Sequence, residues 1–191
     1  MPERNRIRPC EAGDYPALAV LQSACDPEHP VSAADFAHAD ALVDDRIHRA
    51  RYVWRESGEL LGYAGYFQFS MMYDPDRFAL YGGVRPEARR RGIGTALLER
   101  LLADLLPREP RTLGFAQWEY LGEGMEFLLA RGYPEIMRDI ESRVDLAGFD
   151  AGAFAASTRR VATAGLRLVP LTELADGEDL RRRIRDLDMA V

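Results

Sequence analysis

A run of arginines and glycines between two strongly patterned segments constrains the fold of this chain more than any other feature. Phe78–Val84 is rich in aromatic and aliphatic residues and predicts a strand. The chain then becomes basic at Arg89–Arg91 and passes through Gly92-Ile93-Gly94. It enters Ala96–Leu102, an amphipathic helix that ends before Pro107. A strand, a glycine loop and a helix in this order are typical of an anion-binding site at a helix N-terminus.

The residue types in the loop suit a phosphate group. Backbone N–H groups at a helix start converge on an anion, and the helix dipole adds to their attraction. Gly92 and Gly94 have no Cβ to crowd a phosphate and can adopt positive φ. Arg89, Arg90 and Arg91 add local positive charge to an acidic chain. The alternative is a tight turn with a solvated arginine rim, but the flanking strand and helix favour phosphate binding.

Two familiar phosphate loops do not match. A dinucleotide fingerprint requires a third small residue where Leu97 stands, and it usually lies in the first βαβ unit of its domain. A nucleoside triphosphate loop requires Gly-Lys-Ser/Thr, which this sequence lacks. The loop therefore indicates a different phosphate-bearing ligand.

The remaining sequence predicts an α+β fold with a central mixed, mostly antiparallel sheet flanked by helices. Hairpins and helices alternate irregularly, whereas a parallel sheet would show regular βαβ units. One hairpin signal is Ser57-Gly58-Glu59. Further strands are expected at Arg6–Pro9, Tyr52–Trp54, Leu60–Phe67, Thr112–Trp118 and Glu141–Leu146. Further helices are expected after Asp14, from Ser32 to about Ile47, and at Gly124–Ala130 before Gly132.

Composition limits the classes of partner. The 191 residues suit one domain plus some additional chain, and 47% hydrophobic residues are enough for a sizeable core. A net charge of -6 speaks against nucleic acid and anionic membranes, which recruit proteins through excess Lys and Arg. No stretch approaches the ~18 apolar residues of a membrane span. Acidic residues interrupt the first twenty positions, so a secretory signal is not expected and the cytoplasm is the expected compartment.

The cysteines and histidines do not suggest a metal site. Cys10 and Cys25 lack a C-x-x-C spacing and are expected to be free thiols rather than a disulfide. His29, His38 and His48 match neither a zinc-ligand spacing nor a helical pair at i, i+4. We therefore expect no metal.

The C-terminal part leaves two interpretations open. We expect a domain over residues 1–146, a linker rich in Ala and Gly over 147–165, and a strand and helix over 166–191. Leu166–Pro170 and a helix from about Asp179 faintly repeat the opening of the chain. They either begin a second copy of the domain or finish the first one.

The glycine loop and its surroundings resemble a known family. Val84–Leu98, with Arg89-x-x-Gly92-x-Gly94 at its core, looks like the acetyl-CoA signature of the GNAT N-acetyltransferases. The resemblance extends to a hairpin at Glu56–Gly62 and a helix-to-strand segment at Phe127–Tyr133, and it covers roughly residues 5 to 146. It implies that loop amides bind the pyrophosphate and that the preceding strand pairs with the pantetheine arm. The implied cofactor residues are Gly83, Val84, Arg89, Arg90, Arg91, Gly92, Ile93, Gly94 and Thr95.

The resemblance also implies a reaction. The acetyl group of acetyl-CoA would pass to a primary amine of a small molecule or peptide, by direct attack in a ternary complex. An oxyanion donor would be a backbone N–H near Val84. The tyrosine that often donates a proton in the family is replaced by Leu128, and the strand Phe78–Val84 carries no carboxylate. The candidates for acid and base are Tyr81, Glu119, Tyr120 and Glu123, although a half-buried strand tyrosine, solvated loop residues and a water relay are the alternatives.

Acceptor contacts are implied for the first two helices and for the loop Met71–Asp76. Met71, Met72, Tyr73 and Trp118 would form either an apolar acceptor pocket or part of the core. A homodimer is one expected assembly. The competing functional class is a non-catalytic acyl-CoA-binding module, suggested by Leu128 and the missing strand carboxylate.

Overall fold

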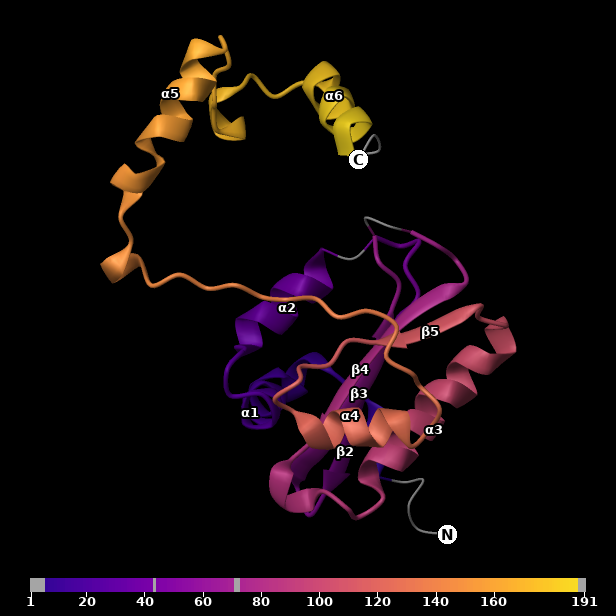
Figure 1. The fold of residues 1–191 in the computed structure, drawn as a ribbon. Coiled ribbons are helices and arrows are strands. Elements are labelled where there is room, and N and C mark those ends of the chain that lie inside the picture. The colour runs from indigo at the N-terminus through magenta and orange to yellow at the C-terminus, as the bar shows by residue number, and fades with distance from the viewer. Residues whose placement is uncertain (1–5, 43, 71–72, 189–191) are drawn as a thin grey trace. The chain divides into compact units, whose positions relative to one another are not determined.

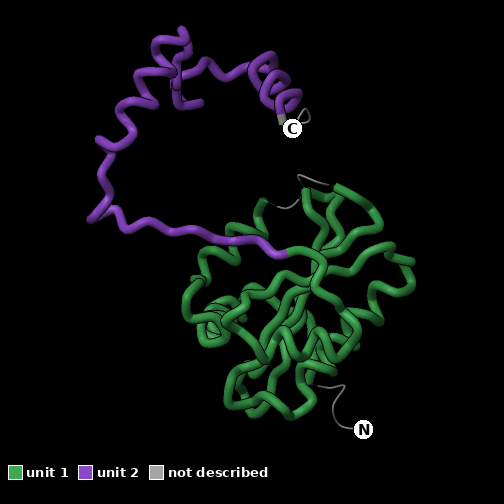
Figure 2. The backbone as a smooth tube through the Cα atoms, in the orientation of Figure 1, with its two compact units in different colours: residues 1–137 green, residues 138–191 purple. Residues whose placement is uncertain are grey.

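The computed structural model describes residues 6–42, 44–70 and 73–188. They divide into two compact units, residues 1–137 and residues 138–191 (Figure 2). The boundary lies earlier than the one expected at residue 146. Each unit is described by itself.

The first unit is built on one five-stranded sheet with strand order β1-β2-β3-β4-β5 (Figure 1). All neighbouring pairs are antiparallel except β4 and β5, which are parallel. This arrangement confirms the predicted α+β class with a mixed, mostly antiparallel sheet. The strands are β1 Ile7–Pro9, β2 Arg49–Glu56, β3 Glu59–Phe67, β4 Arg77–Val84 and β5 Thr112–Phe115.

The β2–β3 hairpin follows from its two turn residues. Ser57 and Gly58 both have positive φ, at 50° and 90°, as a two-residue type I′ turn requires. Glu56 therefore pairs with Glu59 across the turn. The turn fixes the pairing of the residues next to it, and an irregularity between Trp54 and Arg55 shifts the register of the rest of the hairpin by one residue.

Helices cover both faces of the sheet. α1 (Tyr15–Cys25) and α2 (Ala33–Ala41) pack around one buried cluster that includes Val53 and Tyr63. α3 (Ile93–Leu105) packs on the opposite face, and α4 (Gly122–Leu129) adds Phe127 to that side. The buried leucines of α3 follow a helical period and meet Phe78 and Leu80 of β4; these leucines are Leu97, Leu98, Leu101 and Leu105. Each buried leucine side chain contributes about 1.5–3 kcal/mol of transfer free energy.

Two predicted elements of this unit have different lengths in the structure. α2 begins after the Ser32 cap, whose hydroxyl accepts a hydrogen bond from the Asp35 N–H, but it ends at Ala41 rather than near Ile47. β5 ends at Phe115 rather than Trp118, because it pairs only with the first half of β4. The shorter β5 matters for the site described below.

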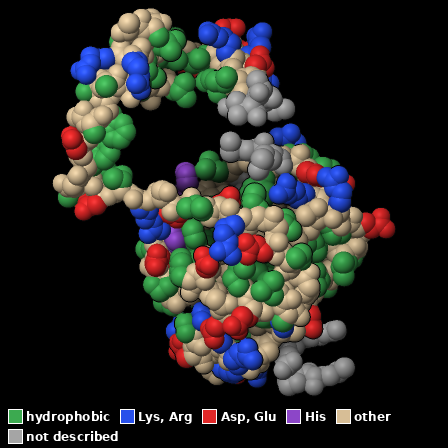
Figure 3. Space-filling view, viewed as in Figure 1, with side chains coloured by type: hydrophobic (Ala, Val, Ile, Leu, Met, Phe, Trp, Pro, Cys, Tyr) green, Lys and Arg blue, Asp and Glu red, His purple; other side chains and the backbone are tan. Residues whose placement is uncertain are grey.

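The second unit differs from its prediction. Its described residues form 3-10 turns, α5 (Ala155–Thr163) and α6 (Glu178–Asp188), and no strand. The strands expected at Glu141–Leu146 and Leu166–Pro170 are therefore absent from this part of the structure, since neither has a partner strand within the unit. The expected linker 147–165 contains α5. Hydrophobic side chains lie on the surface of this unit (Figure 3), among them Leu168 at 81% exposure.

Among the helices formed by described residues, none is both long and apolar enough to span a membrane.

Candidate active site

The sheet opens where its parallel pair ends. The last paired residues are Leu80 of β4 and Phe115 of β5, after which β5 stops and β4 continues to Val84. β4 residues from Tyr81 onward therefore keep β3 as a neighbour on one side only. The other edge of β4 presents backbone groups that β5 does not pair.

The alternation of the backbone decides which residues face this open edge. The N–H of Arg85 donates to the carbonyl of Leu61 at 2.9 Å, so it points toward β3. Because successive residues of a strand point to opposite sides, Val84 and Gly82 present their N–H and C=O groups to the open edge. Gly82 was not among the predicted site residues. It lies two residues before Val84 in the predicted strand, so strand alternation places it on the same edge as Val84.

Gly83, which was predicted to bind the cofactor, turns its backbone toward β3 instead. A Cβ added there would lie 2.9 Å from Tyr63 Cε1 and 3.0 Å from Cys25 Sγ. The glycine therefore lets α1 approach β4 closely. Burial raises the pKa of the Cys25 thiol to about 11, so this thiol stays protonated. Neither cysteine forms a disulfide.

The glycine loop leads directly from β4 into the first turn of α3. Arg90 and Gly92 have φ of 62° and 84°, and Gly92 is the N-cap of the helix. Ala96 donates to the Gly92 carbonyl at 3.0 Å, which begins the helical pattern. The earlier N–H groups of Ile93, Gly94 and Thr95 have no acceptor within the helix. α3 thus starts earlier than predicted, and the signature residues form its exposed, dipole-positive end.

The three arginines have different roles. Arg89 donates from Nε to the carbonyl of Val84 at 3.1 Å and forms an ion pair with Glu123. Arg91 pairs with Glu56 at 2.8 Å. Arg90 is exposed. The local positive field expected from the sequence is therefore partly offset by two glutamates.

Two further observations fit a phosphate-bearing ligand. The Nε of Arg85, the residue that follows β4, is buried and has no hydrogen-bond partner within the described chain. A hollow of about 340 Å³ lies beside the first turn of α3, lined in part by Thr95 and Arg131. Arg131 donates to the Thr95 hydroxyl at 2.6 Å, and its guanidinium lies 3.6 Å from the ring centroid of Phe127. The unpaired Arg85 Nε and, separately, the hollow beside the first turn of α3 both suit an extended nucleotide such as coenzyme A.

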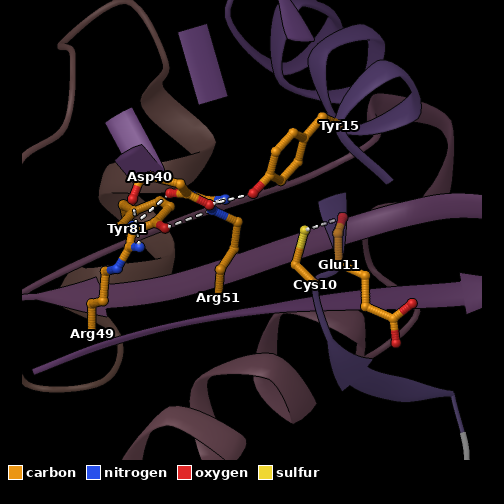
Figure 4. A network of polar contacts seen from close by, with 7 residues as sticks. All are labelled: Cys10, Glu11, Tyr15, Asp40, Arg49, Arg51 and Tyr81. Carbon is orange, nitrogen blue, oxygen red and sulfur yellow. Dashed lines mark hydrogen bonds and ion pairs between the residues drawn. The ribbon is translucent and has the colours of Figure 1, made fainter. Parts of the chain in front are cut away.

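Tyr81 is held by a polar network on the α1 face of the sheet (Figure 4). Arg51 Nε donates to its hydroxyl at 3.1 Å, and the same guanidinium donates to Asp40 at 3.1 and 3.2 Å. Arg49 and Tyr15 also donate to Asp40. Burial raises the pKa of Tyr81, so its phenol is protonated at neutral pH. Arg51 and Asp40 were not among the predicted site residues, because only the fold brings β2 and α2 together here.

The other three candidates lie in and just after the connection from β5 to α4. Glu123 is in the first turn of α4 and pairs with Arg89 of the glycine loop. Glu119 is exposed. Tyr120 donates to Asp26 Oδ1 at 2.5 Å and lies 3.0 Å from His29 Nδ1. The four predicted acid–base candidates therefore have different partners and do not form one cluster.

Asp26, His29, Trp118 and Tyr120 together form what we call the ring cluster. His29 Nδ1 also lies 3.1 Å from Asp26 Oδ2, and the His29 ring stacks on Trp118 at a centroid distance of 4.4 Å. This cluster could not be predicted from the sequence, because about ninety residues separate its two halves. Of the predicted acceptor pocket, Tyr73 and Trp118 are partly exposed, at 44% and 40%, which does not match a core position. Met71 and Met72 lie outside the described residues.

The described residues contain no group of three or more His, Cys, Asp or Glu side chains that could hold a metal ion.

The mixed sheet opens beside a glycine loop at a helix start, and the family match identifies this arrangement as that of an acyltransferase. The chain belongs to the GNAT family of acetyltransferases, whose family model matches residues 16–116. No curated protein matches the sequence.

Solved structures of acetyltransferases share the fold. A ribosomal-protein-alanine N-acetyltransferase from Escherichia coli is 23% identical, with a TM-score of 0.52 over 66% of this chain and 75% of that chain. A phosphinothricin acetyltransferase from Sinorhizobium meliloti, solved with acetyl-CoA, is 22% identical, with a TM-score of 0.55 over 66% and 72%. An aminoglycoside 6′-N-acetyltransferase from Acinetobacter baumannii is 15% identical, with a TM-score of 0.55 over 73% and 97%. These likenesses support the fold alone.

Proposed function

We propose that this acetyltransferase uses acetyl-CoA and transfers the acetyl group to a primary amine of a small molecule or peptide. The observation that carries the proposal is the open edge of β4 beside the N-terminus of α3. The edge offers strand-like pairing to the amides of a pantetheine arm, and the helix start offers N–H donors to a pyrophosphate. The two sites are adjacent along the chain, as the two parts of one coenzyme require.

The chain's own groups account for binding and orientation. Gly82 and Val84 would pair with the arm through their outward N–H and C=O groups, and one such N–H would donate to the thioester oxygen. Ile93, Gly94 and Thr95 would bind the pyrophosphate through their backbone N–H groups. Bound acetyl-CoA supplies the thioester carbon, where the C–N bond to the amine forms, the C–S bond breaks, and the departing thiolate takes up a proton. Positioning of the two reactants supplies much of the rate enhancement.

Glu119, Tyr120 and Glu123 remain our candidates for proton transfer, since all three lie in or just after the connection that follows the end of β5. Tyr81 is less suited, because its buried hydroxyl lies on the α1 face and accepts a hydrogen bond from Arg51. The acceptors named for the similar structures above include a protein alanine, phosphinothricin and aminoglycosides, which are amines. They support an amine acceptor for this chain without identifying it.

Thiol release from acetyl-CoA, measured across a panel of primary amines, tests the proposal. We expect amine-dependent release, together with a higher melting temperature when coenzyme A is added, because a ligand of the folded state stabilises it. NAD and ATP should raise the melting temperature much less. An unchanged melting temperature at millimolar acetyl-CoA, together with stabilisation by another nucleotide, would refute the proposal.

A further inference from the structure

The ring cluster joins two connecting segments at the border of the open edge of β4. Asp26 directly follows Cys25, the residue that packs against Gly83 of β4. Trp118 lies three residues beyond Phe115, the last residue of β5. One segment follows α1 and the other follows β5. The cluster therefore adjoins the residues of β4 and β5 that border this edge, a position suited to contact with an acceptor.

Asp26 gives the cluster a negative charge. Burial opposes ionisation of this carboxyl, but hydrogen bonds from Tyr120 and His29 outweigh burial and lower its pKa. Within the part of the chain that the structure describes, no arginine pairs with Asp26. A carboxylate has about four lone-pair positions, so hydrogen bonds from Tyr120 and His29 leave room for another donor. The side chain is 17% exposed, which allows a small donor to reach it.

The rings beside Asp26 offer flat apolar faces. Trp118 stacks on His29 and also lies near Tyr120, with a centroid distance of 6.0 Å and an interplanar angle of 19° to Tyr120. Trp118 and Tyr120 are nonetheless 40% and 46% exposed. A carboxylate next to exposed aromatic faces is the combination that binds organic cations, because both attract positive charge and the rings also contact hydrocarbon.

We propose that the ring cluster is the acceptor site and selects amines whose protonated group binds Asp26 and whose carbon skeleton contacts Trp118 and Tyr120. The same carboxylate repels acceptors that carry a carboxylate next to the amine. The favoured class is therefore cationic arylalkyl or alkyl amines, in preference to free amino acids. This inference rests on the proposed acetyl transfer, since it assigns the acceptor of that reaction.

Tryptamine and tryptophan form a matched pair that tests the selection, because they differ only in the carboxylate. Binding of each is measured by calorimetry with and without coenzyme A, and kcat/KM is measured with acetyl-CoA. A hydrogen bond to a charged group corresponds to about 10- to 100-fold in affinity, so we expect tryptamine to be favoured by at least about 10-fold. Asp26→Asn should reduce this preference to within about threefold, while leaving the affinity for coenzyme A unchanged.

Two variants control for indirect effects. Asp44 is a carboxylate paired with exposed Arg46 and remote in sequence from the cluster, so Asp44→Asn should preserve the preference. Tyr120→Phe keeps the ring and removes the hydroxyl donor to Asp26, so tryptamine should still bind better than tryptophan. Its kcat separately reports whether the Tyr120 hydroxyl takes part in proton transfer.

Equal binding of tryptamine and tryptophan, or an undiminished preference in a folded Asp26→Asn variant, would overturn the assignment. Failure of acetyl-CoA to bind or to be consumed would instead refute the proposed acetyl transfer. Calorimetry without coenzyme A would still test the ring cluster in that case, because the Asp26-dependent preference for tryptamine needs no turnover.

Discussion

Arg89 connects the glycine loop to the end of β4 by donating from Nε to the carbonyl of Val84 at 3.1 Å. Val84 is one of the two residues whose backbone faces the open edge, so this bond fixes the edge relative to the start of α3. The Nη1 atom of the same guanidinium forms an ion pair with Glu123 of α4. One side chain therefore links the strand, the loop and the following helix around the proposed cofactor site.

We predict that Arg89→Ala weakens coenzyme A binding by about tenfold. Loss of a hydrogen bond from a charged donor costs about 1.5–3 kcal/mol when buried, and the partial exposure of Arg89 reduces that cost. Arg90→Ala is the matched control, since Arg90 is exposed in the same loop. Calorimetric titration with coenzyme A measures both. Equal losses in the two variants would mean that the loop acts through its total charge and not through the Arg89 contact.

Gly94 allows a paired test of the phosphate site. A Cβ at Gly94 would make ordinary contacts with Phe127 and Val84, at 3.4 and 3.6 Å, so Gly94→Ala should fold and bind coenzyme A nearly as the parent does. Gly94→Asp should lose at least about tenfold in affinity, because its charge opposes the pyrophosphate. The apo protein should remain folded, since an acidic residue in the first helical turn is favourable. Tight binding by the Asp variant would place the pyrophosphate elsewhere.

Gly92 should not tolerate substitution, for a different reason, which is its backbone conformation. Nothing lies within 4 Å of a Cβ at Gly92, but its φ of 84° strains any L side chain by about 1–2 kcal/mol. We predict that Gly92→Ala lowers the melting temperature and weakens coenzyme A binding together, because the loop and the helix cap share this residue. Gly13→Ala is the control, since Gly13 also has free space and no positive φ. Similar melting curves for both variants would contradict the prediction.

Most of the fold could be predicted from the sequence because the signals were local. The glycine loop, the Ser57-Gly58 turn, the Ser32 cap and the apolar period of α3 all act within a few residues. The end of β5 and the orientation of Gly83 could not be predicted, because pairing with β4 and packing against Cys25 decide them. The ring cluster depends wholly on tertiary structure, since Asp26 and Tyr120 meet only after the sheet has formed.

Tyr81→Phe should affect stability more than the pH profile of the reaction. Burial raises the pKa of Tyr81, so the phenol stays protonated at every pH below its ordinary pKa of about 10. The stability that the protonated phenol contributes is lost only as the pH rises through the raised pKa. Between about pH 6 and 9, the pH dependence of the rate should therefore be the same for Tyr81→Phe as for the parent protein. Arg51 would lose one acceptor, at a cost of about 1–3 kcal/mol. Urea unfolding measures this cost, with exposed Tyr73→Phe as control, and a lost basic limb in the rate profile would implicate Tyr81 as a catalytic group.

Deleting residues 160–191 tests the role of the second unit. None of the described residues of this unit adds a strand to the sheet. We therefore predict that coenzyme A still raises the melting temperature of the truncated protein. Exposed leucines such as Leu166 and Leu168 would be removed, which should change solubility or oligomeric state. Size-exclusion chromatography and thermal melting measure the two effects. A truncated protein that is unfolded at room temperature would show that this segment completes the first domain.

The two tryptophans occupy opposite environments, and this gives the protein two separable optical signals. Trp54 is 3% exposed in the core, whereas Trp118 is 40% exposed and stacked on His29. Emission from a buried indole lies at shorter wavelength than emission from a hydrated one, and ring stacking changes its intensity. A Trp54→Phe protein would therefore fluoresce from the ring cluster alone, and its emission would follow the arrival of an amine without any label or coupled enzyme.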